Sequence, residues 1–132
     1  MFNQTGHRLP AHATSTGKVL LACLPPEVLH QRLLDWQPTR VTPHTIVDQR
    51  ALLDELRRVA ERGWAQNLEE GAAGAASVAA PVRDEGGQVI AAVSVVGPIS
   101  RARQALPRHR AAVIDAARLI STRIGYALVP GS

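Results

Sequence analysis

Hydroxyl side chains in three parts of the sequence have the types and spacing to bind an acidic small molecule. Thr14, Ser15 and Thr16 stand directly before the apolar segment 18–24, which is typical of a helix that begins with capping side chains. The unpaired N–H groups and the positive dipole end at such a helix start suit an anion. Ser77 and Ser94 lie in two apolar segments, where hydroxyls can donate to a carboxylate without the burial of a full charge.

The same side chains also have a purely structural interpretation, which the sequence leaves open. The hydroxyls before residue 18 can serve only as helix caps, and a serine in a buried strand usually bonds a neighbouring backbone group. Lys18 can lie beside its helix in water. Glu69 and Glu70 are expected in a solvated loop, unless they order the segment that closes the site. His12 has no plausible metal partner nearby, so packing in the core or a loop is expected.

Catalytic and metal-binding patterns do not stand out. Cys23 falls at the end of the predicted helix rather than at its positive start, and apolar neighbours would raise the pKa of its thiol. The five histidines do not fall into ligand spacing, and neither a Ser-His-Asp pattern nor paired carboxylates can be recognised. We therefore expect a protein that is not an enzyme and that uses no metal or other cofactor.

The segment 77–100 must position both strand hydroxyls. Residues 77–83 and 89–96 read as two strands, joined by the loop 84–88 with its two glycines, as a hairpin requires. The arm 89–96 is almost wholly apolar, which predicts a strand covered on both faces. If Ser77 and Ser94 pair across the hairpin, their hydroxyls share one face.

Four helices are predicted around this hairpin, together with a short strand at 64–68. The second follows Pro25-Pro26, the third spans about 48–62 behind a capping box at Thr45 and Asp48, and the last has Pro107 in its first turn. Gly63 is placed to end the third helix. The expected buried stripes of the second, third and last helices are Val28, Leu29, Leu33 and Leu34; Leu52, Leu53, Leu56, Val59 and Ala60; and Val113, Ala116, Ala117, Ile120 and Ile124.

Composition and charge narrow the function classes. The chain has 132 residues, 45% of them apolar and 20% charged, which is ordinary for one folded domain. The net charge of +4 is scattered and lacks interleaved aromatic residues, so no direct nucleic-acid contact by this chain is expected. Without a signal peptide or a membrane-spanning run, we expect a cytoplasmic protein with no membrane partner. Helices alternating with about three strands predict an α+β fold, incomplete on its N-terminal side.

Several blocks together resemble the C-terminal, effector-binding domain of IclR-type bacterial transcription regulators. They occur in the family's order across the chain: RLPAHATSTGKVLLA at 8–22, TPHTIVD at 42–48, LDEL at 53–56, RGWA at 62–65, EEGAAGAASVAAPV at 69–82 and AAVSVVGP at 91–98. The resemblance implies a GAF- or profilin-like fold, in which helices flank a twisted antiparallel sheet. It also implies that residues 1–132 are a single, partial effector-binding domain, without the winged helix-turn-helix that binds DNA in such regulators.

The resemblance also implies a pocket between the first helix and the sheet, at Ser15, Thr16, Asn67, Ser77, Ser94 and Val96. Members that bind small keto acids tend to have an acidic residue in place of Asn67, a Cys in place of Ser77 and a hydroxyl in place of Val96. The less polar site here favours a larger or more apolar ligand, such as an aromatic acid or a longer-chain catabolite.

The leading hypothesis is therefore a ligand-sensing domain that binds a small organic acid and controls DNA binding through association of its subunits, as a homodimer or homotetramer. The alternative is an oligomerisation module without a functional pocket, since an uncovered sheet edge invites pairing.

Overall fold

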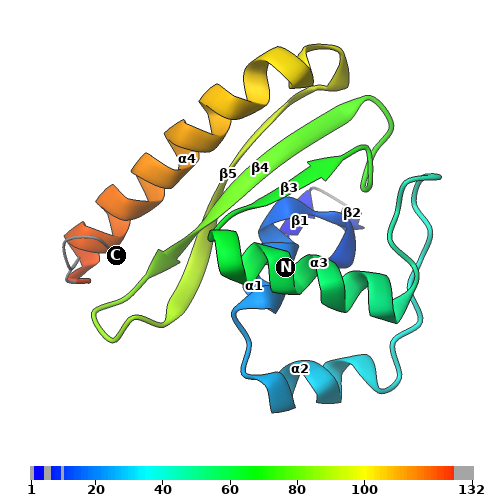
Figure 1. Cartoon of the computed structure of the whole chain (residues 1–132), viewed down its shortest axis with the longest axis horizontal. Coiled ribbons are helices and arrows are strands. Elements are labelled where there is room, and N and C mark those ends of the chain that lie inside the picture. Colours follow the sequence, from blue (N-terminus) through cyan, green and yellow to red (C-terminus); the bar gives the residue numbers. More distant parts are fainter. Residues whose placement is uncertain (1, 5–6, 10, 127–132) are drawn as a thin grey trace.

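The computed structural model of this chain describes residues 2–4, 7–9 and 11–126. Two layers of helices enclose a small sheet (Figure 1). In chain order the elements are β1 (Phe2–Gln4), β2 (His7–Leu9), the 3-10 turn η1 (Ala11–Ala13), α1 (Ser15–Ala22), α2 (Pro26–Leu33), α3 (Gln49–Arg62), β3 (Ala65–Leu68), β4 (Ala75–Arg83), β5 (Val89–Pro98), the 3-10 turn η2 (Ile99–Arg101) and α4 (Ala102–Ile124).

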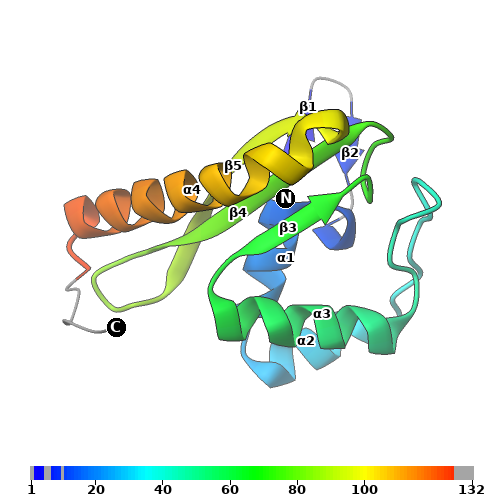
Figure 2. The same ribbon diagram turned by 45° about the horizontal axis from the view of Figure 1, so that its top comes forward.

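The main sheet is antiparallel, with β4 between β3 and β5, and β1 and β2 pair separately. Helix α4 lies along one face of the main sheet, and α1 and α3 lie on the other side (Figure 2). The predicted α+β class, with helices flanking an antiparallel sheet, is confirmed. None of the helices in the described residues is both long and apolar enough to cross a membrane.

Strand β4 is the strand that helices cover on both faces. Its Val78, Ala80 and Val82 pack with Val113 and Ala117 of α4. Its Ala79 faces the other way and packs with the α1 and α3 side of the core. This alternation follows from the two-residue period of a strand, and it leaves β4 almost completely buried.

The prediction that residues 89–96 form the doubly covered strand was wrong. β5 lies at the edge of the main sheet, where Ile90 is 53% and Val96 is 68% exposed. An apolar run indicates that a strand can be buried. Whether it is buried depends on whether helices from elsewhere in the chain pack against its faces. Here those helices pack chiefly over β4.

The last helix begins earlier than predicted. Pro107 lies inside α4 rather than in its first turn, because the helix starts at Ala102, directly after η2. Ala102 is buried and no side chain caps this helix start, so packing rather than a cap fixes its position. The predicted stripe is only partly correct, since Ile120 and Ile124 are each 41% exposed.

The second and third helices also depart from the predicted details. Asp48 itself caps α3 by accepting from the Ala51 N–H, whereas Thr45 bonds elsewhere, so the predicted capping box does not form. Gly63 ends α3 in the left-handed conformation, as predicted. In α2 only Leu33 is buried, and Leu34, which follows the helix, is 60% exposed. In α3, Ala60 is exposed as well.

Candidate ligand-binding site

A cavity of about 500 Å³ opens between the start of α1, the sheet and the loop that connects β3 to β4. Its floor is the face of β4 and β5 opposite α4. The residues that line it are Ala13, Thr14, Ser15, Thr16, Leu20, Asn67, Gly71, Ala72, Ala75, Ala76, Ser77, Ala92, Ser94 and Val96. The structure thus brings the six residues predicted for the site to one cavity.

The start of α1 faces this cavity with hydrogen-bond donors. The helix begins at Ser15, three residues before the predicted segment, and Thr14 is its cap, accepting from the Gly17 N–H at 2.9 Å. The N–H groups of Ser15 and Thr16 belong to the first turn and have no acceptor within the helix. They lie at the positive end of the dipole, where an anion is favoured.

Two serines join this helix start to the floor of the cavity. The hydroxyl oxygens of Ser15 and Ser77 are 2.8 Å apart, and both side chains are buried. Ser94 is not the direct cross-strand partner of Ser77, the pairing considered above: Ser77 lies opposite Val96, and Ser94 lies opposite Ala79. The two strand hydroxyls still line the same cavity, displaced by two residues along the hairpin.

Asn67 is buried in β3, and hydrogen bonds occupy both ends of its amide. Its Nδ2 donates to the Ala13 carbonyl at 2.6 Å, and its Oδ1 accepts from the Glu70 N–H at 2.8 Å. Asn67 therefore holds η1 and the loop after β3 together at the rim of the cavity. An ionised carboxylate at this position could not donate to the Ala13 carbonyl, so this contact requires a donor such as the Asn67 amide.

Glycines allow the chain segments around the cavity to approach closely. A Cβ atom at Gly71 would collide with the Ala13 carbonyl oxygen, and one at Gly17 would collide with the Ala11 carbonyl oxygen. The loop after β3 thus packs directly on the backbone of η1. Two threonine hydroxyls fix the same loop from the other side: Thr42 donates to the Glu69 carbonyl and Thr45 to the Glu70 carbonyl.

Lys18 lies beneath this loop and is completely buried, which excludes the alternative that it lies beside its helix in water. Its Nζ contacts Glu55 at 2.8 Å, Glu70 at 2.7 Å and the Gln66 carbonyl at 2.9 Å. Glu70 is therefore part of a buried ion network that orders the loop, the alternative left open for the Glu69-Glu70 pair.

The charges of this network lower the pKa of the Glu55 carboxyl group. Burial alone would raise the pKa of its carboxyl group, but the hydrogen bond and charge of Lys18, aided by Arg62 and Arg58, hold the pKa below its ordinary value. The carboxylate therefore stays charged beside the ammonium group.

His12 packs behind the rim of the cavity, as predicted for a structural histidine. Its Nε2 donates to the Thr39 carbonyl at 3.2 Å, and its ring meets the Trp36 ring edge-on at 5.3 Å. Burial lowers the pKa of His12, although the Thr39 hydrogen bond and the charge of Glu70 act in the opposite direction. Within the described residues, no group of three His, Cys, Asp or Glu side chains could hold a metal ion.

The cavity can bind an acid through neutral donors. None of the described side chains that line it is charged. The available groups are the first-turn N–H groups of α1 and the hydroxyls of Thr16, Ser77 and Ser94, opposite an apolar wall that includes Leu20, Ala92 and Val96. A carboxylate would be oriented at the helix start while the body of the ligand contacts this wall.

Sequence reasoning missed the cavity-lining residues Gly71 and Ala72 of this loop, and it named no charged partner for Lys18. Gly71 and Ala72 line the cavity, but a glycine between Glu70 and Ala72 indicates only a flexible connection. The one signal for the buried network is the spacing of Lys18 from Val19 and Ala22, which puts the three residues on one helix face; it indicates burial of Lys18 but does not identify its partners.

Comparisons with known proteins place this geometry in a family. The family model described as "Bacterial transcriptional regulator IclR C-terminal" matches residues 1–122. The HTH-type transcriptional regulator XynR of Escherichia coli is 37% identical over 126 residues, which are 95% of this chain and 50% of XynR. The chain thus spans about half the length of this curated relative.

Solved structures agree with this match. The C-terminal domain of the E. coli transcriptional regulator KdgR is 37% identical, with a TM-score of 0.82 over 89% of this chain and 72% of that one. The inducer-binding domain of a double mutant of the transcription factor PobR from Acinetobacter, in complex with 3-hydroxybenzoic acid, is 33% identical. Its TM-score is 0.81 over 88% of this chain and 67% of that one.

Proposed function

This chain belongs to the family of C-terminal domains of bacterial IclR-type transcriptional regulators, and we propose that it is a ligand-sensing domain whose cavity binds a small organic acid. The observation that carries the proposal is the meeting of the α1 start with the hydroxyls of Ser77 and Ser94 at one cavity. In this proposal Ser15, Thr16, Ser77 and Ser94 contact the ligand, Asn67 shapes the rim and Val96 forms part of the apolar wall.

The size and lining of the cavity support an acid with an apolar body. A volume of about 500 Å³ lies within the usual range for sites that bind metabolite-sized ligands. A two- or three-carbon acid would leave the wall of Leu20, Ala92 and Val96 uncovered. The 3-hydroxybenzoic acid bound by the related PobR domain is an acid of the fitting kind, so we infer an aromatic or longer-chain acid here.

Signalling would require that the acid bind one arrangement of subunits more tightly than another. A ligand with equal affinity for two arrangements shifts neither, however tightly it binds. We propose that the chain acts in a homodimer or homotetramer, and that the part of the regulator that contacts DNA lies outside this chain.

A thermal-shift screen tests the proposal. Aromatic acids, including 3-hydroxybenzoate and benzoate, are compared with pyruvate and glyoxylate on the folded chain. We expect at least one aromatic or longer-chain acid to raise the melting temperature, and the two small keto acids to have little effect. A folded sample that no acid of the panel stabilises would count against sensing.

Two variants test whether the stabilising acid binds in the cavity. Ser94→Val removes a hydroxyl that lines the cavity, whereas Ser100→Val makes the same change in η2, at an exposed residue outside it. We expect the first variant to weaken the best acid about tenfold, the worth of one hydrogen bond to a charged group, and the second to leave its affinity unchanged. Equal affinity in both would remove Ser94 from the site.

One observation favours the second candidate function, a module for association alone. β5 forms an edge of the sheet with exposed Ile90 and Val96, and unpaired edges with apolar side chains promote pairing between chains. Light scattering combined with the acid screen separates the two candidates. A stable oligomer whose melting temperature no acid of the panel changes would support association alone.

A further inference from the structure

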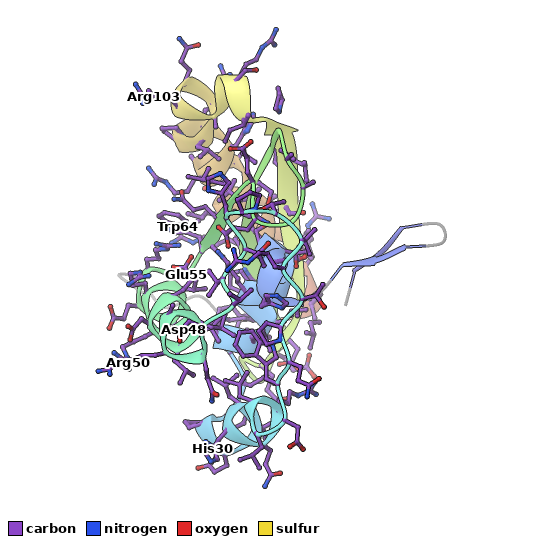
Figure 3. All side chains as sticks on the ribbon, turned by 90° about the vertical axis from the view of Figure 1, so that its right-hand side faces the viewer. His30, Asp48, Arg50, Glu55, Trp64 and Arg103 are labelled. Atoms are coloured by element: carbon purple, nitrogen blue, oxygen red, sulfur yellow. The ribbon has the colours of Figure 1, made fainter. Side chains whose placement is uncertain are left out.

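Two arginine side chains contact the indole ring of Trp64, which packs on the opposite face of the sheet from the cavity. The guanidinium carbon of Arg62 lies 4.0 Å from the centroid of the ring, and that of Arg110 lies 4.7 Å from it. Trp64 itself packs against the core cluster of β4 and α4. It lies on the side of the molecule where α3 and α4 approach each other (Figure 3).

Arg62 is anchored but not fully satisfied. Its Nε donates to the Trp64 carbonyl at 2.8 Å, which fixes the side chain at the end of α3. Its Nη2 is buried and has no hydrogen-bond partner in the described part of the chain. A buried guanidinium nitrogen without an acceptor is rare in folded proteins, since the loss of hydration is not compensated.

Positive charge is in excess around this nitrogen. Burial lowers the pKa of Arg62, and the neighbouring charges of Arg58 and Arg110 lower it further, whereas Glu55 acts in the opposite direction. The Glu55 oxygens are already engaged, one by Lys18 at 2.8 Å and the other by Arg58 at 3.4 Å. Arg110, on α4, has no ion pair in the described residues.

A purely structural role explains only part of this arrangement. Each arginine is attracted to the face of the Trp64 ring, which accounts for the stacking. That attraction can hold one guanidinium group at each face of the ring, but it leaves the Arg62 Nη2 without an acceptor. A bound anion would supply the acceptor and reduce the repulsion between Arg62 and Arg110.

We propose that Arg62 and Arg110, stacked on Trp64, form a second binding site, which takes a small oxyanion such as a carboxylate or phosphate group. The fork of a guanidinium group matches the oxygens of both groups. Arg110 is partly exposed, and in this proposal its side chain turns aside to admit the anion. None of the residues that line the acid cavity takes part, so this proposal stands independently of the proposed function.

The two indole N–H signals of the folded chain provide a direct measurement. Trp64→Phe assigns the signal of Trp64 and leaves that of Trp36 as an internal reference. Sodium phosphate and sodium acetate are titrated against sodium chloride at equal ionic strength, with the proton–nitrogen spectrum as the readout. We expect a saturable shift of the Trp64 signal with phosphate, acetate or both, and none with chloride; the response to each shows which oxyanion the site accepts.

Arg110→Gln and Arg103→Gln form a matched pair on α4. Both remove one positive charge, but Arg103 is exposed near the start of the helix, away from Trp64 (Figure 3). We expect Arg110→Gln to weaken the oxyanion about tenfold or more, and Arg103→Gln to leave the titration unchanged. A shift that does not saturate, that chloride reproduces, or that both variants reduce equally would overturn the proposal.

Arg62→Gln should weaken the oxyanion in the same titration. Its control is Arg57→Gln, an exposed position on the same helix, which should leave the titration unchanged. If Arg62→Gln prevents folding, the comparison of Arg110 with Arg103 decides alone.

Discussion

The hydroxyl groups of Ser15 and Ser77 lie 2.8 Å apart and join the start of α1 to the central strand across 62 residues of sequence. The pair fixes the first turn of the helix against the floor of the cavity. It also means that each hydroxyl has a partner in the absence of ligand. An acid that binds here would extend an existing hydrogen-bond network rather than create one.

Replacement of Ser77 by alanine should cost about 1 kcal/mol of stability, because the buried Ser15 hydroxyl loses its partner. Urea unfolding of Ser15→Ala, Ser77→Ala and the double variant measures the coupling. The double variant should be less destabilised than the sum of the two single variants. Strict additivity would mean that the two hydroxyls do not interact in solution.

Lys18→Met should destabilise the chain by about 3 kcal/mol, because Glu55 and Glu70 lose the ammonium group between them. We take the lower end of the range for a broken buried ion pair because both carboxylates retain some exposure. Urea unfolding gives the value.

The variant Lys18→Met with Glu55→Gln and Glu70→Gln tests the cause. It should recover part of the loss, since no uncompensated charge remains. A triple variant even less stable than Lys18→Met would show that packing, rather than charge, holds this part of the core.

His12 should make the chain less stable as the pH falls below about 6.5. Burial lowers the pKa of the folded side chain below 6.5, its ordinary value, so the unfolded chain binds the proton first. The contribution is fully present above 6.5 and is lost as the pH falls toward the lower, folded value.

Urea unfolding at pH 7.5 and 5.5 measures this loss, with His12→Gln as the variant and exposed His30→Gln as its control. The difference between the two pH values should shrink in His12→Gln alone. An identical difference in all three proteins would contradict the assignment.

Gly71→Ala should distort the rim of the cavity, because the new methyl group would overlap the Ala13 carbonyl oxygen. We expect a loss of about 1–3 kcal/mol and weaker binding of the best acid. Gly86→Ala is the matched control, since its Cβ would lie 3.4 Å from the Asp84 side chain in an exposed turn. If the two variants have the same affinity and stability, the close contact of the loop with η1 has no bearing on the site.

The sequence was most informative where a local signal and the tertiary structure agree. The hairpin, a hydroxyl cap of α1 within residues 14–16 and the Gly63 end of α3 each depend on a few neighbouring residues, and each was predicted. Burial of whole elements was less predictable. Ile90 in β5 and Ile120 in α4 are apolar but exposed, since cover depends on which distant element packs there.

The six residues named from the sequence line one cavity, but their individual contacts could not be predicted. The first turn of α1 and the two strand serines converge as the resemblance implied, and the register across the hairpin is offset by two residues. The ion pairs of Lys18 could not be predicted, because its partners Glu55 and Glu70 come from segments 37 and 52 residues away. No local pattern reports such a distant pairing.

The central claim is that an acid binds in the cavity between α1 and the β4–β5 hairpin, and a crystal structure with the most stabilising acid tests it most directly. We predict its carboxylate at the N–H groups of Ser15 and Thr16 and its apolar body against Leu20 and Val96. An acid bound elsewhere on the chain, or a cavity that stays filled only with solvent at saturating acid, would contradict the account.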